Sequence, residues 1–182
     1  MSAPLDSLLF WGSLAALAWT HAGYPAAAAA ARLAPRPVRR EEILPSVTVI
    51  IAAHDEEAVI RRRVENLLEL DYPAELVEIV VASDASTDRT DTIVEEIAMR
   101  EPRVSLLACP RGGKVAAQNL AVARTDADIV AFSDANATWA PDALRLLVRS
   151  FADPEVAYCC GRLVLEAADG TNSEGAYWRL ET

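Results

Sequence analysis

Short apolar segments rich in β-branched residues alternate with helical segments along the chain from residue 47 onward. We expect strands at residues 47–52, 76–82, 104–109 and 129–132, with a fifth strand beginning at 156–160. We expect helices at residues 58–70, 90–100, 114–123 and 141–151. This alternation predicts an α/β fold with a mainly parallel sheet and flanking helices, because parallel strands need a crossover connection that a helix usually supplies.

Clusters of polar residues follow the first four predicted strands. They are residues 54–57, 83–86, 111–114 and 133–136. In a parallel sheet the carboxyl ends of the strands lie at one edge, and ligands of open α/β sheets bind outside that edge. The sequence therefore predicts one binding site, built from turns that are far apart in the chain.

Asp134 and Asn136 follow the fourth predicted strand with one residue between them. In an extended turn alternate side chains point the same way, so both oxygens can meet one hard cation such as Mg²⁺ or Mn²⁺. Such a cation commonly also binds phosphate oxygens. The alternative is a plain turn, in which these side chains bond only to nearby backbone groups.

Asp84 follows the second predicted strand, where its carboxylate can accept hydrogen bonds from a ribose or a base. The alternative is capping of the next helix, which explains Ser86 and Asp88 well and leaves both roles open for Asp84. Asp55 and Glu56 follow the first predicted strand and can line a pocket. Acidic residues at a helix start are, however, also favoured by the helix dipole.

Lys114, the only lysine in the chain, follows Gly112 and Gly113. Two glycines let the backbone approach a ligand closely or adopt a positive φ, and the ammonium group can then pair with a phosphate. The alternative is a glycine turn followed by an ordinary exposed lysine.

Residues 8–33 form a long and almost wholly apolar segment near the N-terminus. As one helix it would extend ~39 Å, enough to cross a ~30 Å hydrocarbon layer. A signal peptide would begin with positive charge, but no Lys or Arg precedes Arg32, and a core helix would rarely be uncharged for so long. We therefore expect a transmembrane anchor at 1–34, a linker at 35–45 and a cytoplasmic domain at 46–182, since basic residues at 32–40 favour the cytoplasmic side.

Net charge and missing motifs exclude several classes of protein. A formal net charge of −10 argues against nucleic acid as a partner, because its phosphates need a basic surface. No GxGxxG follows the first strand and no GxxxxGK[ST] occurs, so dinucleotide-binding and P-loop sites are unsupported. Three cysteines without a CxxC pair predict reduced thiols in the core.

Three blocks of sequence resemble the inverting glycosyltransferases of family 2. They are VTVIIAAHDEEAVI, VVASDASTDRT and RGGKVAAQNLAVARTDADIVAFSDAN. The first resembles the family's opening strand and its PxxNE turn, with Ala52, Asp55 and Glu56 at the Pro, Asn and Glu places. The second resembles the DDxSxD block, with Ser83 at the first Asp. The third resembles the run that begins with GK and ends with DAD, with Asn136 at the last Asp.

The resemblance implies a GT-A fold, a Rossmann-like sheet that binds a nucleotide-diphospho-sugar, with UDP-sugars favoured. It implies Asp84 at the nucleoside, Lys114 near the nucleotide, and Asp134 with Asn136 at a Mg²⁺ or Mn²⁺ ion. The residues expected to contact the donor are Ala52, Asp55, Glu56, Asp84, Lys114 and Asp134.

The general base of this family is an acidic residue in a later segment, so we expect it beyond Thr182 and assign no catalytic residue within the chain. We expect the donor-binding half of a membrane-anchored transferase of the inner membrane that acts on a carbohydrate or lipid-linked acceptor, in polysaccharide or glycoconjugate synthesis. One alternative is a donor-binding module without turnover. A nucleotidyltransferase is less favoured, because it would need a Gly-rich basic loop after the first strand, where the chain has AAHDEE.

Overall fold

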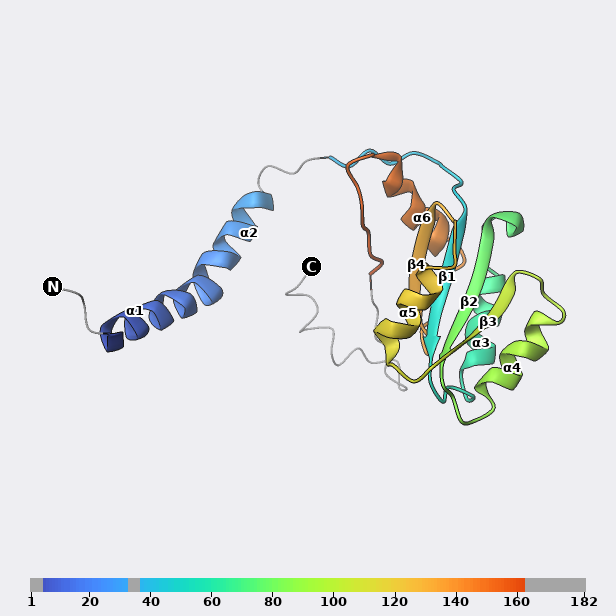
Figure 1. The fold of residues 1–182 in the computed structure, drawn as a ribbon. Coiled ribbons are helices and arrows are strands. Elements are labelled where there is room, and N and C mark those ends of the chain that lie inside the picture. The colour runs from blue at the N-terminus through green and yellow to red at the C-terminus, as the bar shows by residue number, and fades with distance from the viewer. Residues whose placement is uncertain (1–4, 33–36, 163–182) are drawn as a thin grey trace, which may run out of the picture. The chain divides into compact units, whose positions relative to one another are not determined.

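The computed structural model describes residues 5–32 and 37–162, and the chain divides into two compact units, Met1–Val38 and Arg39–Thr182. The first unit contains helix α1 (Leu5–Ala18), a π-helical turn (Trp19–Gly23) and helix α2 (Tyr24–Arg32), seen in blue in Figure 1.

The prediction of a transmembrane helix near the N-terminus is wrong. Within the described parts of the chain, no helix is both long enough and apolar enough to span a membrane. The apolar segment is divided, because the 14-residue α1 gives way to π-helical geometry and then to the nine-residue α2. At 1.5 Å per residue α1 reaches only ~21 Å, short of the ~30 Å hydrocarbon layer.

The second unit is built on a parallel four-stranded sheet with the order β3-β2-β1-β4. The strands are β1 (Val47–Ala53), β2 (Val77–Asp84), β3 (Val104–Cys109) and β4 (Ile129–Asp134). The helices are α3 (Ile60–Leu68), α4 (Thr90–Ala98), α5 (Lys114–Val122) and α6 (Ala143–Val148), with 3-10 turns at Ala74–Leu76 and Arg149–Ala152. The predicted α/β fold with a parallel sheet is therefore confirmed.

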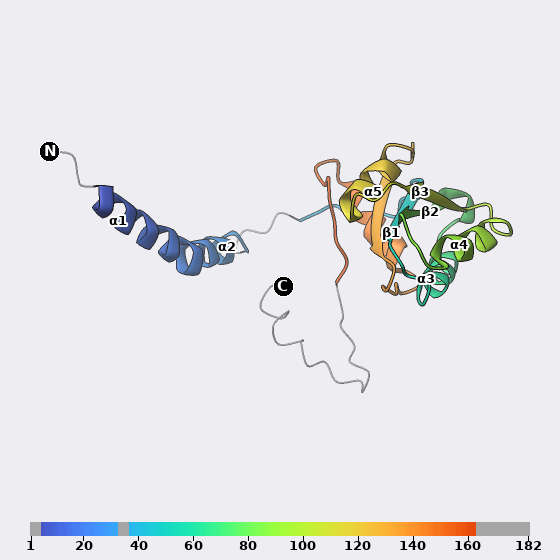
Figure 2. The same ribbon diagram turned by 60° about the horizontal axis from the view of Figure 1, so that its bottom comes forward.

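Helices cover both faces of the sheet, and β1 shows why its sequence is almost continuously apolar. Val49 and Ile51 pack in a core with residues of α3, α4 and α6, while Ile50 packs in a second core with Ala117 and Ala121 of α5. Figures 1 and 2 show α5 on the face of the sheet opposite α3 and α4. A strand buried on both faces loses the alternation of apolar and polar residues.

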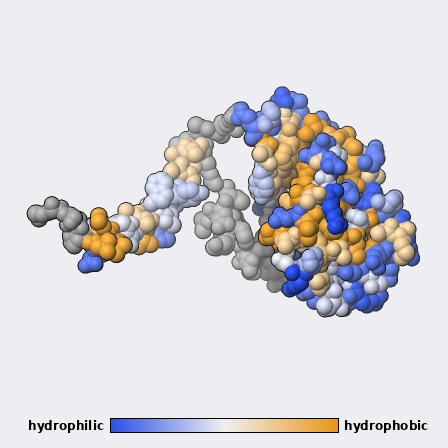
Figure 3. Space-filling view, viewed as in Figure 1, coloured by the Kyte–Doolittle hydropathy of each residue, from blue (hydrophilic) through white to orange (hydrophobic). Residues whose placement is uncertain are grey.

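The face that carries α5 is the less completely covered of the two. Figure 3 shows apolar residues at the surface on the viewed face of this domain. The exposed apolar side chains of the domain include Leu120 and Val122 of α5 and Phe132 of β4.

Two predictions are wrong: the fifth strand at residues 156–160 and the burial of all three cysteines in the core. Residues 156–160 form no strand, because nothing in the described part of the chain pairs with them, and Tyr158 is 81% exposed. The cysteines are free, as expected, but only Cys109 is buried, whereas Cys160 is exposed. The apolar residues of 156–160 suggested a strand, but a strand also needs a neighbouring strand to pair with.

The strand order reverses direction at β1. The chain moves from β1 to β2 and β3 through α3 and α4, and then returns through α5 to β4 on the other side of β1. Right-handed crossovers place helices on opposite faces when the direction reverses, which opens a crevice at the carboxyl ends of β1 and β4. The topology therefore provides a binding crevice where polar side chains are expected.

Two leucines of α6 test its packing. Leu144 is 1% exposed and Leu146 is 51% exposed. We expect Leu144→Ala to lower the free energy of unfolding by about 2–5 kcal/mol, because it leaves a cavity in the core. Leu146→Ala, the matched control, should lower it by less than about 1 kcal/mol. Urea denaturation followed by circular dichroism measures both, and equal losses would contradict this placement of α6.

Candidate functional site

A cavity of about 320 Å³ opens at the carboxyl ends of the strands. Its size suits a small-molecule ligand. Six of the seven side chains proposed from the sequence line it, and Asp55 does not. The lining residues are Ala52, Ala53, His54, Glu56, Asp84, Lys114, Asp134, Ala135 and Asn136.

Strand register places the two central aspartates on either side of β1. Ala52 lies beside Asp134 of β4 and beside Ala82 of β2, and Asp84 ends β2 two residues later. The small side chains of Ala52 and Ala53 lie between the two acids and leave room at the strand end.

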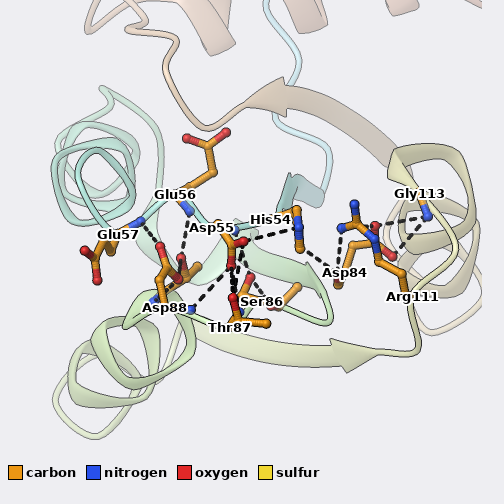
Figure 4. Close-up of polar contacts among 12 residues, drawn as sticks. His54, Asp55, Glu56, Glu57, Asp84, Ser86, Thr87, Asp88, Arg111 and Gly113 are labelled. Atoms are coloured by element: carbon orange, nitrogen blue, oxygen red, sulfur yellow. Dashed lines mark hydrogen bonds and ion pairs between the residues drawn. The ribbon is translucent and has the colours of Figure 1, made fainter.

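Asp84 is almost fully buried, and its carboxylate holds the turn that follows β3 (Figure 4). It accepts hydrogen bonds from the backbone amides of Gly112 at 2.7 Å and Gly113 at 3.0 Å, and from Arg111 Nη1 at 3.1 Å. The Gly112 amide is the main cause of a lowered Asp84 pKa; the Gly113 amide and Arg111 add to it, and burial opposes it. Asp84 is therefore an anion fixed by backbone donors.

The two glycines of this turn are required by its geometry. Gly113 has a φ of +83°, in a region that favours glycine. A Cβ at Gly112 would lie 2.9 Å from Ala116 Cβ, closer than the two atoms can approach. The RGGK sequence thus lets the backbone wrap around Asp84 and start α5 at Lys114.

Lys114 and Asp134 form an ion pair at the cavity, Nζ to Oδ1. Their side chains are 56% and 60% exposed, so water screens the pair. Exposed pairs of this kind contribute little to stability. Both groups are therefore free to exchange partners when an anion or a cation binds.

Asp134 and Asn136 offer two oxygen donors for a hard cation, and Asn136 is exposed at the cavity. No group of three or more His, Cys, Asp or Glu side chains in the described residues could form a metal site by itself. Mg²⁺ characteristically uses one or two protein oxygens and completes its shell with water and substrate phosphates. The donor set therefore fits a cation that binds together with a phosphate ligand.

Asp55 connects two loops instead of lining the cavity. Its Oδ1 accepts hydrogen bonds from the backbone amides of Thr87 at 2.6 Å and Asp88 at 3.3 Å. The residue has a φ of 55°, a left-handed conformation that Asp and Asn tolerate better than most residues. Its expected place beside the donor is thus not supported by the geometry.

Further bonds join the same two loops in both directions (Figure 4). The Glu57 amide donates to Asp88 Oδ2 at 2.9 Å, and the Arg89 amide donates to Glu57 Oε2 at 3.0 Å. Asp88 Oδ1 also accepts from the Thr90 amide at 2.8 Å, although the N-cap position of α4 is occupied by Arg89, which makes no side-chain cap bond. The β1–α3 and β2–α4 loops therefore form one rigid wall.

His54 is a cavity residue that the sequence analysis did not select. Its Nδ1 lies 2.9 Å from the carbonyl oxygen of Asp84, and its Nε2 lies 3.3 Å from Asp55 Oδ2. It therefore links the loop wall to the Asp84 turn. Its position directly after the first predicted strand could have indicated that it lines the cavity.

Comparison with known proteins identifies the family of this site. Residues 48–180 match the profile of Glycosyl transferase family 2. The chain belongs to this family. The match includes all seven residues proposed from the sequence, and it argues against the nucleotidyltransferase alternative.

Individual family members are similar at moderate identity. The chain is 40% identical over 113 residues to a beta-monoglucosyldiacylglycerol synthase of Synechocystis sp., covering 60% of this chain and 24% of that protein. It is 34% identical over 154 residues to the protein of the same name from Nostoc sp., covering 82% and 33%. The chain thus spans a quarter to a third of these relatives.

A solved family structure has a similar fold. The mannosyltransferase PcManGT of Pyrobaculum calidifontis, solved in complex with GDP-Man and Mn²⁺, superposes with a TM-score of 0.67 and 35% identity. The superposition covers 81% of this chain and 46% of that protein. It supports the GT-A fold for the sheet and its helices.

Asp55 gives a pH-dependent test of the loop wall. The Thr87 amide is the main cause that lowers the Asp55 pKa below its ordinary value of 3.8, with Asp88, His54 and the Thr87 hydroxyl adding to it. The stability contributed by the ionised carboxylate is therefore present above that value, and it is lost as pH falls through the lower folded pKa.

We expect Asp55→Ala to lower the thermal unfolding midpoint at pH 7, with the difference from wild type shrinking toward pH 3. Asp55→Asn keeps an oxygen acceptor for the Thr87 amide but lacks the charge, so it should recover only part of the midpoint at pH 7. Differential scanning calorimetry across this pH range measures the effect. A difference that stays constant with pH would show that the charge plays no part.

Proposed function

We propose that the chain is the donor-binding part of a glycosyltransferase that uses a nucleotide-diphospho-sugar. The observation that carries the proposal is the cavity at the point where the strand order reverses, with Asp84 on one side and Lys114, Asp134 and Asn136 on the other. Family membership supports the same class of reaction.

The cavity offers different chemistry for each part of the donor. A carboxylate has about four lone-pair sites, and Asp84 already accepts four contacts, one from Gly112, two from Gly113 and one from Arg111. A nucleoside donor would therefore take the place of Arg111, whose side chain is 59% exposed. Lys114 is placed to pair with a phosphate. Asp134 and Asn136 would hold Mg²⁺ or Mn²⁺, which would offset the negative charge of the diphosphate.

We propose that the sugar is transferred with inversion in a single displacement. The acceptor hydroxyl oxygen bonds to the anomeric carbon while the bond from that carbon to the diphosphate breaks, and the departing diphosphate takes the electron pair. The hydroxyl proton passes to a base. By resemblance to the family, this base is an acidic residue in a later segment of the enzyme. The cation, when bound, supplies charge stabilisation for the leaving diphosphate, and Lys114 adds a second positive charge.

Named relatives support the choice of donor and acceptor classes. PcManGT was solved with GDP-Man and Mn²⁺, which supports a nucleotide-diphospho-sugar donor and a divalent ion here. UDP remains the nucleotide that we favour, and GDP is the alternative to test. Two relatives are named beta-monoglucosyldiacylglycerol synthases, which supports a lipid-linked or carbohydrate acceptor.

Calorimetric titration of the 182-residue chain with UDP, and separately with GDP, tests this function. We expect binding of at least one nucleotide to strengthen when Mn²⁺ is added. Asp134→Ala should remove that Mn²⁺-dependent gain and weaken binding by about tenfold or more, the size of a lost charged contact.

Asp126→Ala is the matched control, because Asp126 is an exposed aspartate just before the other end of β4. It should bind as wild type does. Failure of the wild-type chain to bind either nucleotide would contradict the proposed function. Equal effects of the two substitutions would contradict the role of Asp134.

A further inference from the structure

Arg63 of α3 is a buried charge on the apolar side of its helix. It is 1% exposed and shares a stripe with the buried residues Ile60, Val64 and Leu67. Charged side chains are rarely fully buried unless they are paired. The sequence pattern shows this arginine on the apolar stripe, but the three adjacent arginines 61–63 conceal which one is buried.

The partners of the Arg63 guanidinium are neutral. Nη2 donates to Ser133 Oγ at 2.7 Å, Nη1 donates to Asn66 Oδ1, and the group lies 4.9 Å from the centre of the Trp139 ring. No carboxylate among the described residues forms a salt bridge with it. Its Nε is buried without a hydrogen-bond partner.

Arg63 nevertheless stays charged at neutral pH. Burial lowers its pKa to about 10, and the negative charge of Asp134 opposes that lowering. Among the described side chains, the charged group that affects the Arg63 pKa most is therefore the carboxylate of Asp134, which lines the cavity. Burying a cation without an ion pair costs stability, and an apolar side chain of similar size often serves a core better.

The contacts of Arg63 and Asn66 hold the segment that contains Asp134 and Asn136. Ser133 Oγ accepts from Arg63 and donates to the carbonyl oxygen of Asp134 at 3.1 Å. At the other end, Asn66 accepts from the Trp139 amide at 2.9 Å and donates to the Trp139 carbonyl at 3.0 Å. Residues 133–139 are thus fastened to α3 at both ends.

We propose that Arg63 is a positioning residue of the donor site, which fixes residues 133–139 so that Asp134 and Asn136 face the cavity. Its buried charge also gives a fixed positive field beneath the place where an anionic diphosphate would bind. This inference rests on the proposed function and adds a residue that does not line the cavity. It gives a functional reason for a buried cation whose desolvation costs stability.

The test compares Arg63→Met, Arg63→Lys and Arg62→Met in the 182-residue chain. Arg62 is exposed on the same helix and serves as the matched control. The affinities for uridine, and for UDP or GDP with and without Mn²⁺, are measured by calorimetry, and the thermal midpoint is measured alongside.

We expect Arg63→Met to weaken Mn²⁺-dependent nucleotide binding by about tenfold, with unchanged affinity for uridine and a thermal midpoint at or above that of wild type. Arg63→Lys keeps the charge and should recover part of the affinity. Arg62→Met should behave as wild type in every measurement.

Two results would overturn the proposal: unchanged Mn²⁺-dependent binding in Arg63→Met, or an equal loss of affinity for uridine, which indicates a general structural role. If Arg63→Met fails to fold, Asn66→Ala decides, because it frees the Trp139 end and should weaken the same Mn²⁺-dependent binding. A wild-type chain that binds no nucleotide would instead contradict the proposed function.

Discussion

Parallel pairing of β1 with both β2 and β4 is the constraint on which the rest of the structure depends. It places the ends of three strands side by side, so that Asp84 and Asp134 flank two alanines although they are 50 positions apart in sequence. The reversal of strand order at β1 then opens the crevice between them. A slip of one residue in the β1–β4 register would turn Asp134 to the other face of the sheet.

Backbone amides, more than side-chain cations, organise the acidic residues around this crevice. The amides of Gly112 and Gly113 hold Asp84, and the amides of Thr87 and Asp88 hold Asp55. These bonds lower the pKa of each carboxyl and convert flexible loops into fixed walls. Lys114 and Asp134 are held less tightly, which suits groups that must exchange partners with a ligand.

The sequence predicted the parts of the structure that depend on local pattern. Strand β3 has the expected bounds and the helices lie where expected, because apolar period and turn residues determine both. The polar clusters that follow the strands lie together because parallel pairing puts the carboxyl ends of all four strands at one edge of the sheet. The cavity therefore has six of the seven expected side chains.

The failed predictions depend on interactions that local sequence does not contain. Apolar composition in residues 8–33 did not reveal the π-helical turn at Trp19–Gly23. A strand at 156–160 needed a partner that the described chain does not provide. The placement of Asp55 beside the donor stays a prediction; sequence alone did not show that its carboxylate accepts hydrogen bonds from amides 32 and 33 residues away. The expected cytoplasmic placement rested on the membrane anchor and stays a prediction.

Nuclear magnetic resonance with a paramagnetic ion tests the central claim, that separate strand-end turns form one nucleotide-diphosphate site. Backbone amide signals of the 182-residue chain are compared in Mn²⁺ alone and in Mn²⁺ with UDP or GDP. The account predicts that adding nucleotide concentrates signal broadening at residues 133–136 and 112–114 and leaves residues 125–128, at the opposite end of the sheet, unaffected. Broadening centred elsewhere, or unchanged by nucleotide, would contradict it.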